Sequence, residues 1–224
     1  MEVSSRDIGR QVRISRKIEL KSEKWLVVCE GIKTEVNYFN SLFEYINSKY
    51  DRKIKYEVKG AGRNTESLVR YVGNYFASVS YSSRKSDIPY AKVFVAFDKD
   101  SFGREQFDNA INMAQRKKYI ALWSNECFEL WYILHFEMLE EDIGRKEYFR
   151  KLDKLFGCKY DKSAKDHFWL LNSERNLGTA IARAKELYNR TADFESYSDR
   201  VPCTTVFRLT DEIERHLNVG RIEL

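Results

Sequence analysis

The feature that most constrains the fold is a regular alternation of short apolar runs with amphipathic segments before residue 137. Four apolar runs predict strands, at residues 24–30, 53–59, 90–97 and 119–123. Four segments with apolar side chains at helical spacing follow them, at residues 34–49, 64–82, 103–116 and 126–136. This alternation is typical of an α/β fold with a parallel sheet that helices cover on both faces.

The strand pattern stops near residue 140. Four further helices are expected, at residues 146–156, 163–171, 174–189 and 205–217. We therefore predict three parts. These are a polar N-terminal arm (1–22), a core with a four-stranded parallel sheet (23–137), and a helical C-terminal region packed on that core (138–224).

Composition restricts the class of protein. No window approaches the apolar length of a membrane span, and the first residues lack an apolar signal region, so we expect a cytoplasmic protein with no membrane partner. The four cysteines are scattered without a CxxC pair, which favours reduced thiols. The net charge is +5, and residues 145–190 carry twelve Lys and Arg against six Asp and Glu. A basic surface suits a polyanion, although a solvated face of a basic protein is the more common explanation.

Two carboxylates follow the apolar run that ends at Phe97. Asp98 and Asp100 are one residue apart, so the alternation of a strand places them on the same side. Like charges at this spacing repel each other unless a cation lies between them, and a divalent ion is the usual solution. The alternative is that Asp100 caps the helix that follows Gly103.

Further acids follow the first and fourth predicted strands. Glu30 ends the first strand and is followed by Gly31, and Glu35 comes in the first turn of the next helix. Glu129 follows the fourth strand. Because parallel strands end at one edge of a sheet, and open α/β sheets bind ligands there, these acids predict a metal site together with Asp98.

Simpler interpretations exist for each of these acids. Glu35 suits the helix dipole, with Thr34 as the N-cap, and Lys33 can pair with Glu30. Glu129 can form a capping box with Ser124 or Asn125, either of which is expected to cap the fourth helix. His135 is interpreted as structural, although it could reach a phosphate. No phosphate-binding glycine loop and no nucleophile with a paired base is present, so acyl transfer is unsupported.

Three blocks of the chain resemble the RloB-like family. They are CEGIKTEVNYF from Cys29, FDKD from Phe97, and SNECFELWYILHF from Ser124, in the family's order within residues 24–137. The sequence VPCTTV, which begins at Val201, is similar to the family's Asn-Pro-Ser-Thr-x-Val block and departs from it at Val201 and Cys203.

RloB-like proteins are similar to the Toprim superfamily. The resemblance implies a Toprim-like (Rossmann-like) sheet, a catalytic glutamate at Glu30, and metal ligands at Asp98 and Asp100. Related overcoming-lysogenization-defect nucleases have a second metal-binding glutamate, and Glu35 fits that place. The family's association with restriction-modification and abortive-infection loci implies a phage-defence effector beside an ATPase of the ABC or SMC type.

The first functional hypothesis is a Mg²⁺- or Mn²⁺-dependent nuclease, with RNA favoured over DNA by analogy with other defence effectors. Its predicted metal ligands are Glu30, Glu35, Asp98 and Asp100. Its predicted catalytic residues are Glu30, Lys33 and Glu129, with Lys33 or Lys99 stabilising the developing charge. Its predicted contacts with nucleic acid are Lys99, Arg104, Arg150, Lys154, Lys165 and Arg175.

Two other hypotheses stay open. In the second, the protein is a non-catalytic binding or regulatory module that works with a partner ATPase, and the acids hold a structural ion. In the third, it is a scaffold protein whose acids only cap helices. A homo-oligomer is compatible with each of the three.

Overall fold

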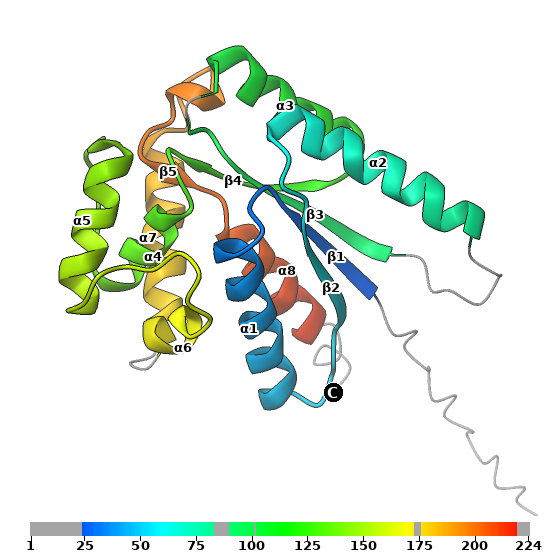
Figure 1. Ribbon diagram of the computed structural model, residues 1–224, viewed down its shortest axis with the longest axis horizontal. Coiled ribbons are helices and arrows are strands. Elements are labelled where there is room, and N and C mark those ends of the chain that lie inside the picture. Colours follow the sequence, from blue (N-terminus) through cyan, green and yellow to red (C-terminus); the bar gives the residue numbers. More distant parts are fainter. Residues whose placement is uncertain (1–23, 83–89, 101, 173–175, 219–224) are drawn as a thin grey trace, which may run out of the picture.

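Five strands form a single sheet in the order β2-β1-β3-β4-β5 in the computed structural model (Figure 1), which describes residues 24–82, 90–100, 102–172 and 176–218. The strands are β1 (Lys24–Cys29), β2 (Lys55–Gly60), β3 (Tyr90–Asp98), β4 (Ile120–Asn125) and β5 (Cys203–Thr204). The first four are parallel, and β5 runs antiparallel to β4. The predicted arm at residues 1–22 lies outside the described residues.

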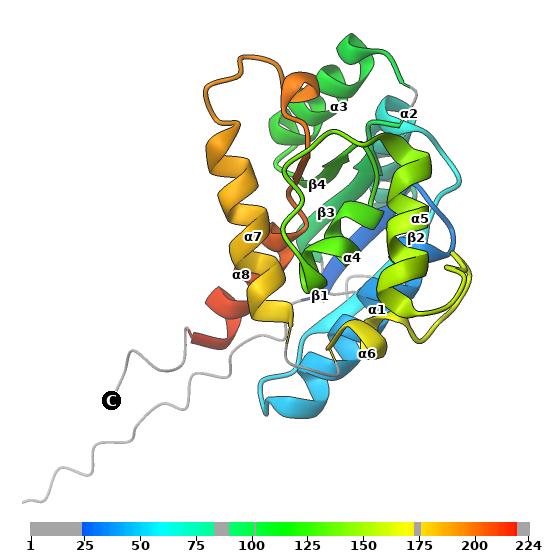
Figure 2. The same ribbon diagram turned by 90° about the vertical axis from the view of Figure 1, so that its left-hand side faces the viewer.

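Helices cover both faces of this sheet, which confirms the predicted α/β class (Figure 1). One face carries α2 (Thr65–Ser82) and α3 (Arg104–Arg116). The other face carries α1 (Thr34–Lys49), α4 (Glu129–Phe136), α7 (Leu177–Arg190) and α8 (Phe207–Asn218). Two further helices contact α4 and lie on the side of it away from α7, namely α5 (Gly144–Phe156) and α6 (His167–Asn172) (Figure 2). A 3-10 turn, η1 (Tyr197–Asp199), precedes β5.

The fifth strand corrects the predicted four-stranded sheet and the prediction that no strand follows residue 140. Its two residues pair with the end of β4, where Thr204 lies opposite Ser124 and Cys203 opposite Asn125. The next residue adds a hydrogen bond from the Thr205 N–H to the carbonyl of Trp123, at 2.8 Å. A strand of two residues has no alternating pattern to detect in a sequence, so only its tertiary partner defines it.

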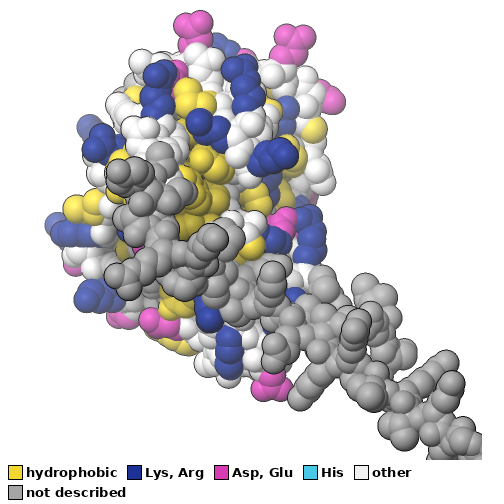
Figure 3. Space-filling view, turned by 90° about the vertical axis from the view of Figure 1, so that its right-hand side faces the viewer, with side chains coloured by type: hydrophobic (Ala, Val, Ile, Leu, Met, Phe, Trp, Pro, Cys, Tyr) yellow, Lys and Arg dark blue, Asp and Glu magenta, His cyan; other side chains and the backbone are white. Residues whose placement is uncertain are grey.

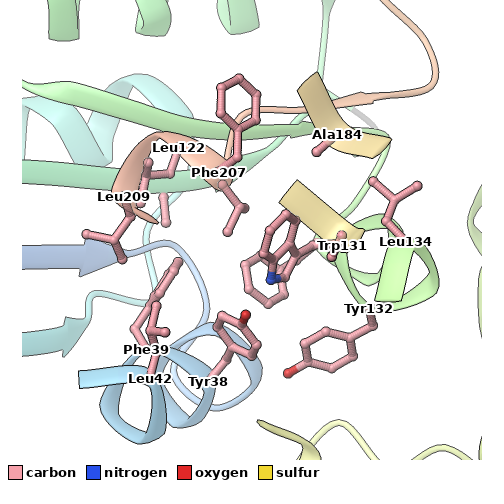
Figure 4. Packing of buried hydrophobic residues seen from close by; sticks show 14 of the residues in the cluster. Tyr38, Phe39, Leu42, Leu122, Trp131, Tyr132, Leu134, Ala184, Phe207 and Leu209 are labelled. Carbon is pink, nitrogen blue, oxygen red and sulfur yellow. The ribbon is translucent and has the colours of Figure 1, made fainter. Parts of the chain in front are cut away.

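The core has two parts because the strands alternate between the two faces. Along β1, Trp25, Val27 and Cys29 pack toward α1, α4, α7 and α8, whereas Leu26 and Val28 pack toward α2 and α3. The first part is rich in aromatic side chains, and the close view shows Tyr38 of α1 beside Trp131 and Tyr132 of α4 (Figure 4). This packing fixes α1 and α4 on the sheet, and their first turns lie beside the strand ends.

The two edges of the sheet differ in character. Near the edge at which β1 and β3 begin, hydrophobic side chains lie between Lys and Arg side chains (Figure 3). The predicted site residues lie at the opposite edge, where β1, β3 and β4 end. None of the helices in the described residues is both long and apolar enough to cross a membrane.

Candidate metal and phosphate site

A cleft of about 280 Å³ lies at the carboxyl edge of the sheet. Five carboxylates line it: Glu30, Glu35, Asp98, Asp100 and Glu129. Three cations line it as well: Lys33, Arg145 and Lys162. A larger cavity of about 570 Å³, between α1, α7 and α8, contains none of the predicted site residues. The structure therefore brings all five predicted acids to one place.

The parallel pairing of β1 with β3 places Glu30 beside Asp98. The Glu30 N–H donates to the carbonyl of Ala96 at 2.8 Å, which extends the ladder one residue past β1. The Asp98 N–H then donates to Oε2 of Glu30 at 3.4 Å. Two acids that are far apart in the sequence thus meet because their strands are neighbours that end together.

Glu35 reaches the cleft from the first turn of α1 by folding back over Gly31. The Gly31 N–H donates to Oε1 of Glu35 at 3.3 Å, and the glutamate is only 8% exposed. A Cβ atom at Gly31 would lie 2.8 Å from this oxygen and 2.9 Å from Cδ. A glycine is therefore needed for this carboxylate to occupy its place. A glutamate that only interacted favourably with the helix dipole would not need to be buried among other acids.

Glu129 reaches the same cleft from the first turn of α4. It is 2% exposed, accepts a hydrogen bond from the Tyr160 hydroxyl at 3.2 Å, and lies 3.0 Å from Nζ of Lys162. The helix begins after Phe128, and no side chain caps it. The capping-box interpretation of Glu129, with Ser124 or Asn125 as the cap, is therefore wrong.

The side chains that were expected to cap α4 serve β5 and η1 instead. Ser124 bonds to the hydroxyl of Thr204 at 2.9 Å, and the Asn125 amide donates to the carbonyls of Ser198 and Arg200 at 2.9 and 3.1 Å. These polar groups thus hold the returning chain rather than the helix that follows them in the sequence.

Asp100 lies just beyond β3 with a φ of 43°, which is uncommon for a residue with a side chain. Its carboxylate forms an ion pair with Arg145 of α5. The N-cap of α3 is Gly103, without a side-chain hydrogen bond, so the interpretation of Asp100 as a helix cap is wrong. The backbone turn directs this acid toward the cleft and toward the C-terminal half of the chain.

Burial, together with the charges of neighbouring carboxylates, raises the pKa values of Glu30, Glu35 and Asp98. Burial and the charges of Glu35 and Asp100 raise the pKa of Glu30 to about 7. Burial raises the pKa of Asp98 well above its usual range, and the charges of Glu35, Glu129 and Glu30 add to this. The pKa of Glu35 is raised by burial and by Glu129. Negative charge is therefore unfavourably concentrated here, and a bound cation would relieve it.

The donor set suits a hard divalent cation, since carboxylate oxygens are the ligands that Mg²⁺ and Mn²⁺ prefer. Within the described ranges, no three His, Cys, Asp or Glu side chains are arranged to ligate one ion as they stand. Two of the five acids are instead engaged by side-chain cations, Asp100 by Arg145 and Glu129 by Lys162. The residues fit a metal by chemistry and position, and ligation requires some of these side chains to turn.

The predicted contacts with nucleic acid do not gather at the cleft. Lys33, which was predicted as a catalytic residue, does line the cleft and is exposed. The ion pairs found among the described residues do not join Lys33 to Glu30, the partner expected for it. Arg104 pairs with Asp199, and Arg150 pairs with Glu147. The others do not line the cleft: Lys99 follows β3 between Asp98 and Asp100, Lys154 lies in the last turn of α5, and Lys165 precedes α6. Arg175 is outside the described residues.

Sequence reasoning missed two cations and the role of two polar residues. Arg145 and Lys162 were only part of a basic stretch, in which nothing distinguishes them. Thr34 is not the N-cap of α1, since that position is held by Lys33 without a side-chain bond. The Thr34 hydroxyl donates to the carbonyl of Lys162 at 3.0 Å, and the Asn37 amide to that of Ala164 at 3.3 Å.

Neither His135 nor any of the four cysteines is among the residues that line the cleft. His135 is 1% exposed, and its Nδ1 bonds to the carbonyl of Trp131 at 2.9 Å, so the structural interpretation is confirmed and a phosphate contact is excluded. All four cysteines are free, as predicted. Cys158 is exposed, and the other three are buried.

Comparison with known proteins gives one match. The family model of the RloB-like protein matches residues 25–213, which is most of the chain and includes the whole cleft. No curated protein and no solved structure matches the chain. The α/β sheet and its five converging acids lie within the residues that the family model matches. The chain therefore belongs to the RloB-like protein family.

Proposed function

We propose that this protein is a Mg²⁺- or Mn²⁺-dependent nuclease that hydrolyses phosphodiesters, with RNA favoured over DNA. One observation carries the proposal: five acids from two strand ends and two helix starts meet in one cleft, at the edge where open α/β sheets bind ligands. The resemblance to Toprim proteins supports the same assignment, since it implies a catalytic glutamate at Glu30 and metal ligands at Asp98 and Asp100.

Each acid has a role in the proposal. Asp98, Asp100 and Glu35 would hold the cation, which when bound supplies neutralisation of the scissile phosphate and a lower pKa for an attacking water. Glu30, whose carboxylate lies against the backbone of Asp98, would move the proton as general base or acid or act as a bridging ligand. Glu129 completes the acidic wall, and Lys33 faces the site from the exposed turn before α1.

The biological part of the proposal depends on the resemblance alone. As a phage-defence effector of the abortive-infection kind, the protein would act in the cytoplasm on nucleic acid, beside an ATPase of the ABC or SMC type. Homo-oligomerisation is compatible with this proposal.

The test is a cleavage assay with matched isosteric variants. Purified protein is incubated with RNA and with DNA in Mg²⁺ and in Mn²⁺, beside Glu30→Gln, Asp98→Asn and the remote control Asp211→Asn. We expect cleavage by the wild type and the control, and a loss of at least about 100-fold in the first two variants. Equal cleavage by all four proteins would contradict the assignment of Glu30 and Asp98 as site residues, since a contaminating nuclease gives that result.

A second candidate function is a non-catalytic module that binds nucleic acid or regulates a partner ATPase. The ion pairs of Arg145 with Asp100 and of Lys162 with Glu129 favour it, because they neutralise two of the acids without a metal. Metal binding and a stable complex with an ATPase, with no turnover of any nucleic acid, would support this function over the first.

A further inference from the structure

Two cations from the C-terminal half of the chain enter the acidic cleft side by side. Arg145 lies in the first turn of α5, and Lys162 lies in the connection between α5 and α6. Both pack on one aromatic ring. Nζ of Lys162 lies 4.6 Å and Cζ of Arg145 lies 5.9 Å from the ring centroid of Phe149. A shared ring holds two like charges close together, where carboxylates on the other side attract them.

These two side chains are partly exposed to solvent. The side chain of Arg145 is 36% exposed and that of Lys162 is 43% exposed, whereas Glu129, the partner of Lys162, is only 2% exposed. Each cation is therefore a long, partly solvated arm that ends on an acid of the cleft. A cation bound by the acids would compete for these carboxylates and release the arms toward the opening.

A polyanion approaching this cleft meets a strongly unfavourable field. When all five carboxylates are ionised, they outnumber the three cations of the lining by two. A phosphate can approach only if positive groups stand beside the acids, and Arg and Lys are the side chains that bind phosphate oxygens. Arg145 and Lys162 are placed at that boundary, whereas Arg104 and Arg150 are engaged at other surface positions.

The backbone around Lys162 is held by the turn that carries Glu35. The Thr34 hydroxyl donates to the Lys162 carbonyl at 3.0 Å, and the Asn37 amide donates to the carbonyls of Ser163 and Ala164 at 3.4 and 3.3 Å. The first turn of α1 therefore positions one carboxylate and one cation of the cleft together. Such a link fixes the distance between the metal-binding side and the phosphate-binding side.

We propose that Arg145 and Lys162 contact the phosphates of a nucleic acid strand bound in the cleft, and that Thr34 and Asn37 are positioning residues for Lys162. This inference rests on the proposed function, because it assigns the substrate contacts of that same site. The contacts are to the backbone, so they are the same for RNA and DNA.

The test measures binding without turnover. Fluorescence anisotropy follows a labelled 20-nucleotide RNA and the same DNA sequence in Ca²⁺, over a series of salt concentrations. Arg145→Ala and Lys162→Ala are each expected to raise Kd roughly tenfold and to lower the slope of log Kd against log salt by about one. Lys162→Arg, which keeps the charge, is expected to bind within about twofold of the wild type.

Matched controls separate this role from a general loss of charge. Lys185 is 42% exposed, pairs with Asp211 at 2.6 Å and lies 5.7 Å from the ring of Phe207, so it repeats the surroundings of Lys162 away from the cleft. Lys185→Ala should leave Kd within about twofold and the salt slope unchanged.

The positioning residues are tested through their coupling to Lys162. Thr34→Val should raise Kd, whereas Thr34→Ser, which keeps the hydroxyl, should not. In the presence of Lys162→Ala, Thr34→Val should add nothing further, because its effect passes through Lys162. An additive loss in the double variant would contradict the positioning role.

The outcomes distinguish the two proposals. Unchanged affinity and salt slope in Arg145→Ala and Lys162→Ala, an equal loss in Lys185→Ala, or a wild type that binds neither polymer would overturn the phosphate contacts. A wild type that binds as described and cleaves nothing in Mg²⁺ would overturn the nuclease proposal and leave these contacts standing.

Discussion

The backbone N–H of Asp98 donates to the carboxylate of Glu30, at 3.4 Å from Oε2, although 67 residues separate the two in the chain. The hydrogen bond joins the first residue after β1 to the last residue of β3. It lies at the centre of the cleft, with Glu35 and Glu129 near enough to raise the pKa of Asp98. The carboxylates that would bind a cation therefore destabilise this region when no cation is bound. This effect on stability can be measured.

Asp98→Asn should stabilise the metal-free protein and remove its response to Mg²⁺. The amide keeps the shape of the side chain and removes one of several mutually repelling charges. At pH 7.5 the free energy of unfolding in urea should rise by about 1 kcal/mol. Millimolar Mg²⁺ should raise the melting temperature of the wild type and leave that of the variant nearly unchanged. Asp211→Asn, far from the cleft, serves as the control and should respond like the wild type.

Gly60→Ala should destabilise the fold by about 1–3 kcal/mol. A Cβ atom at this position would lie 2.6 Å from Cα of Ile32 and 2.7 Å from the carbonyl oxygen of Gly31, both of which are backbone atoms that cannot move alone. Gly178→Ala in α7, where nothing lies within 4 Å, is the control and should stabilise by about 0.5–1 kcal/mol. Chemical denaturation measures both values, and equal values for the two variants would contradict the close approach at Gly60.

Thr205→Val should cost about 1–3 kcal/mol although it preserves the shape of the side chain. The Thr205 hydroxyl accepts the N–H of Trp123 at 2.8 Å, and this site is fully buried. A valine would leave that donor without its partner. Thr205→Ser should retain most of the stability. Thr210→Val on α8, whose hydroxyl donates only to the carbonyl of Phe207 in its own helix, should cost less than about 0.5 kcal/mol.

His135 should make the protein less stable in mild acid. Burial, with a contribution from the charge of Arg183, lowers the pKa of this histidine to about 4 in the folded protein. The unfolded chain takes up a proton near pH 6.5, so between pH 6.5 and 4 it binds more protons than the folded protein. This contribution to the free energy of unfolding is complete above that window and is lost as the pH falls through it.

The measurement compares the wild type with His135→Phe, which cannot titrate at this position. Between pH 7.5 and 5.0, the wild type should lose about 2 kcal/mol more than the variant in urea unfolding. The raised pKa values of the cleft acids act in the opposite direction in both proteins, and the difference between the two removes them. Parallel pH dependence in the two proteins would mean that His135 is protonated inside the fold.

The order of strands and helices and the strand-end position of Glu30 and Asp98 were predictable from the sequence. Both follow from local rules: apolar runs are buried as strands, helical spacing gives one apolar face, and parallel strands end at one edge. The placement of Glu35 was predictable for a similar reason, because it lies in the first turn of the helix that follows the end of β1. The sequence blocks also indicated the family, which the family model matched over residues 25–213.

The tertiary structure alone decided which polar groups meet across the chain. Arg145 and Lys162 reach the cleft, and Lys154 does not, because the packing of α5 on α4 brings only the start of α5 near the strand ends. Thr34 and Asn125 have the sequence context of helix caps, yet their side chains bond to segments more than 70 residues away. Local sequence determines a residue's own helix or strand, whereas a long-range polar contact depends on where the whole chain returns, which is set by the summed packing of distant elements.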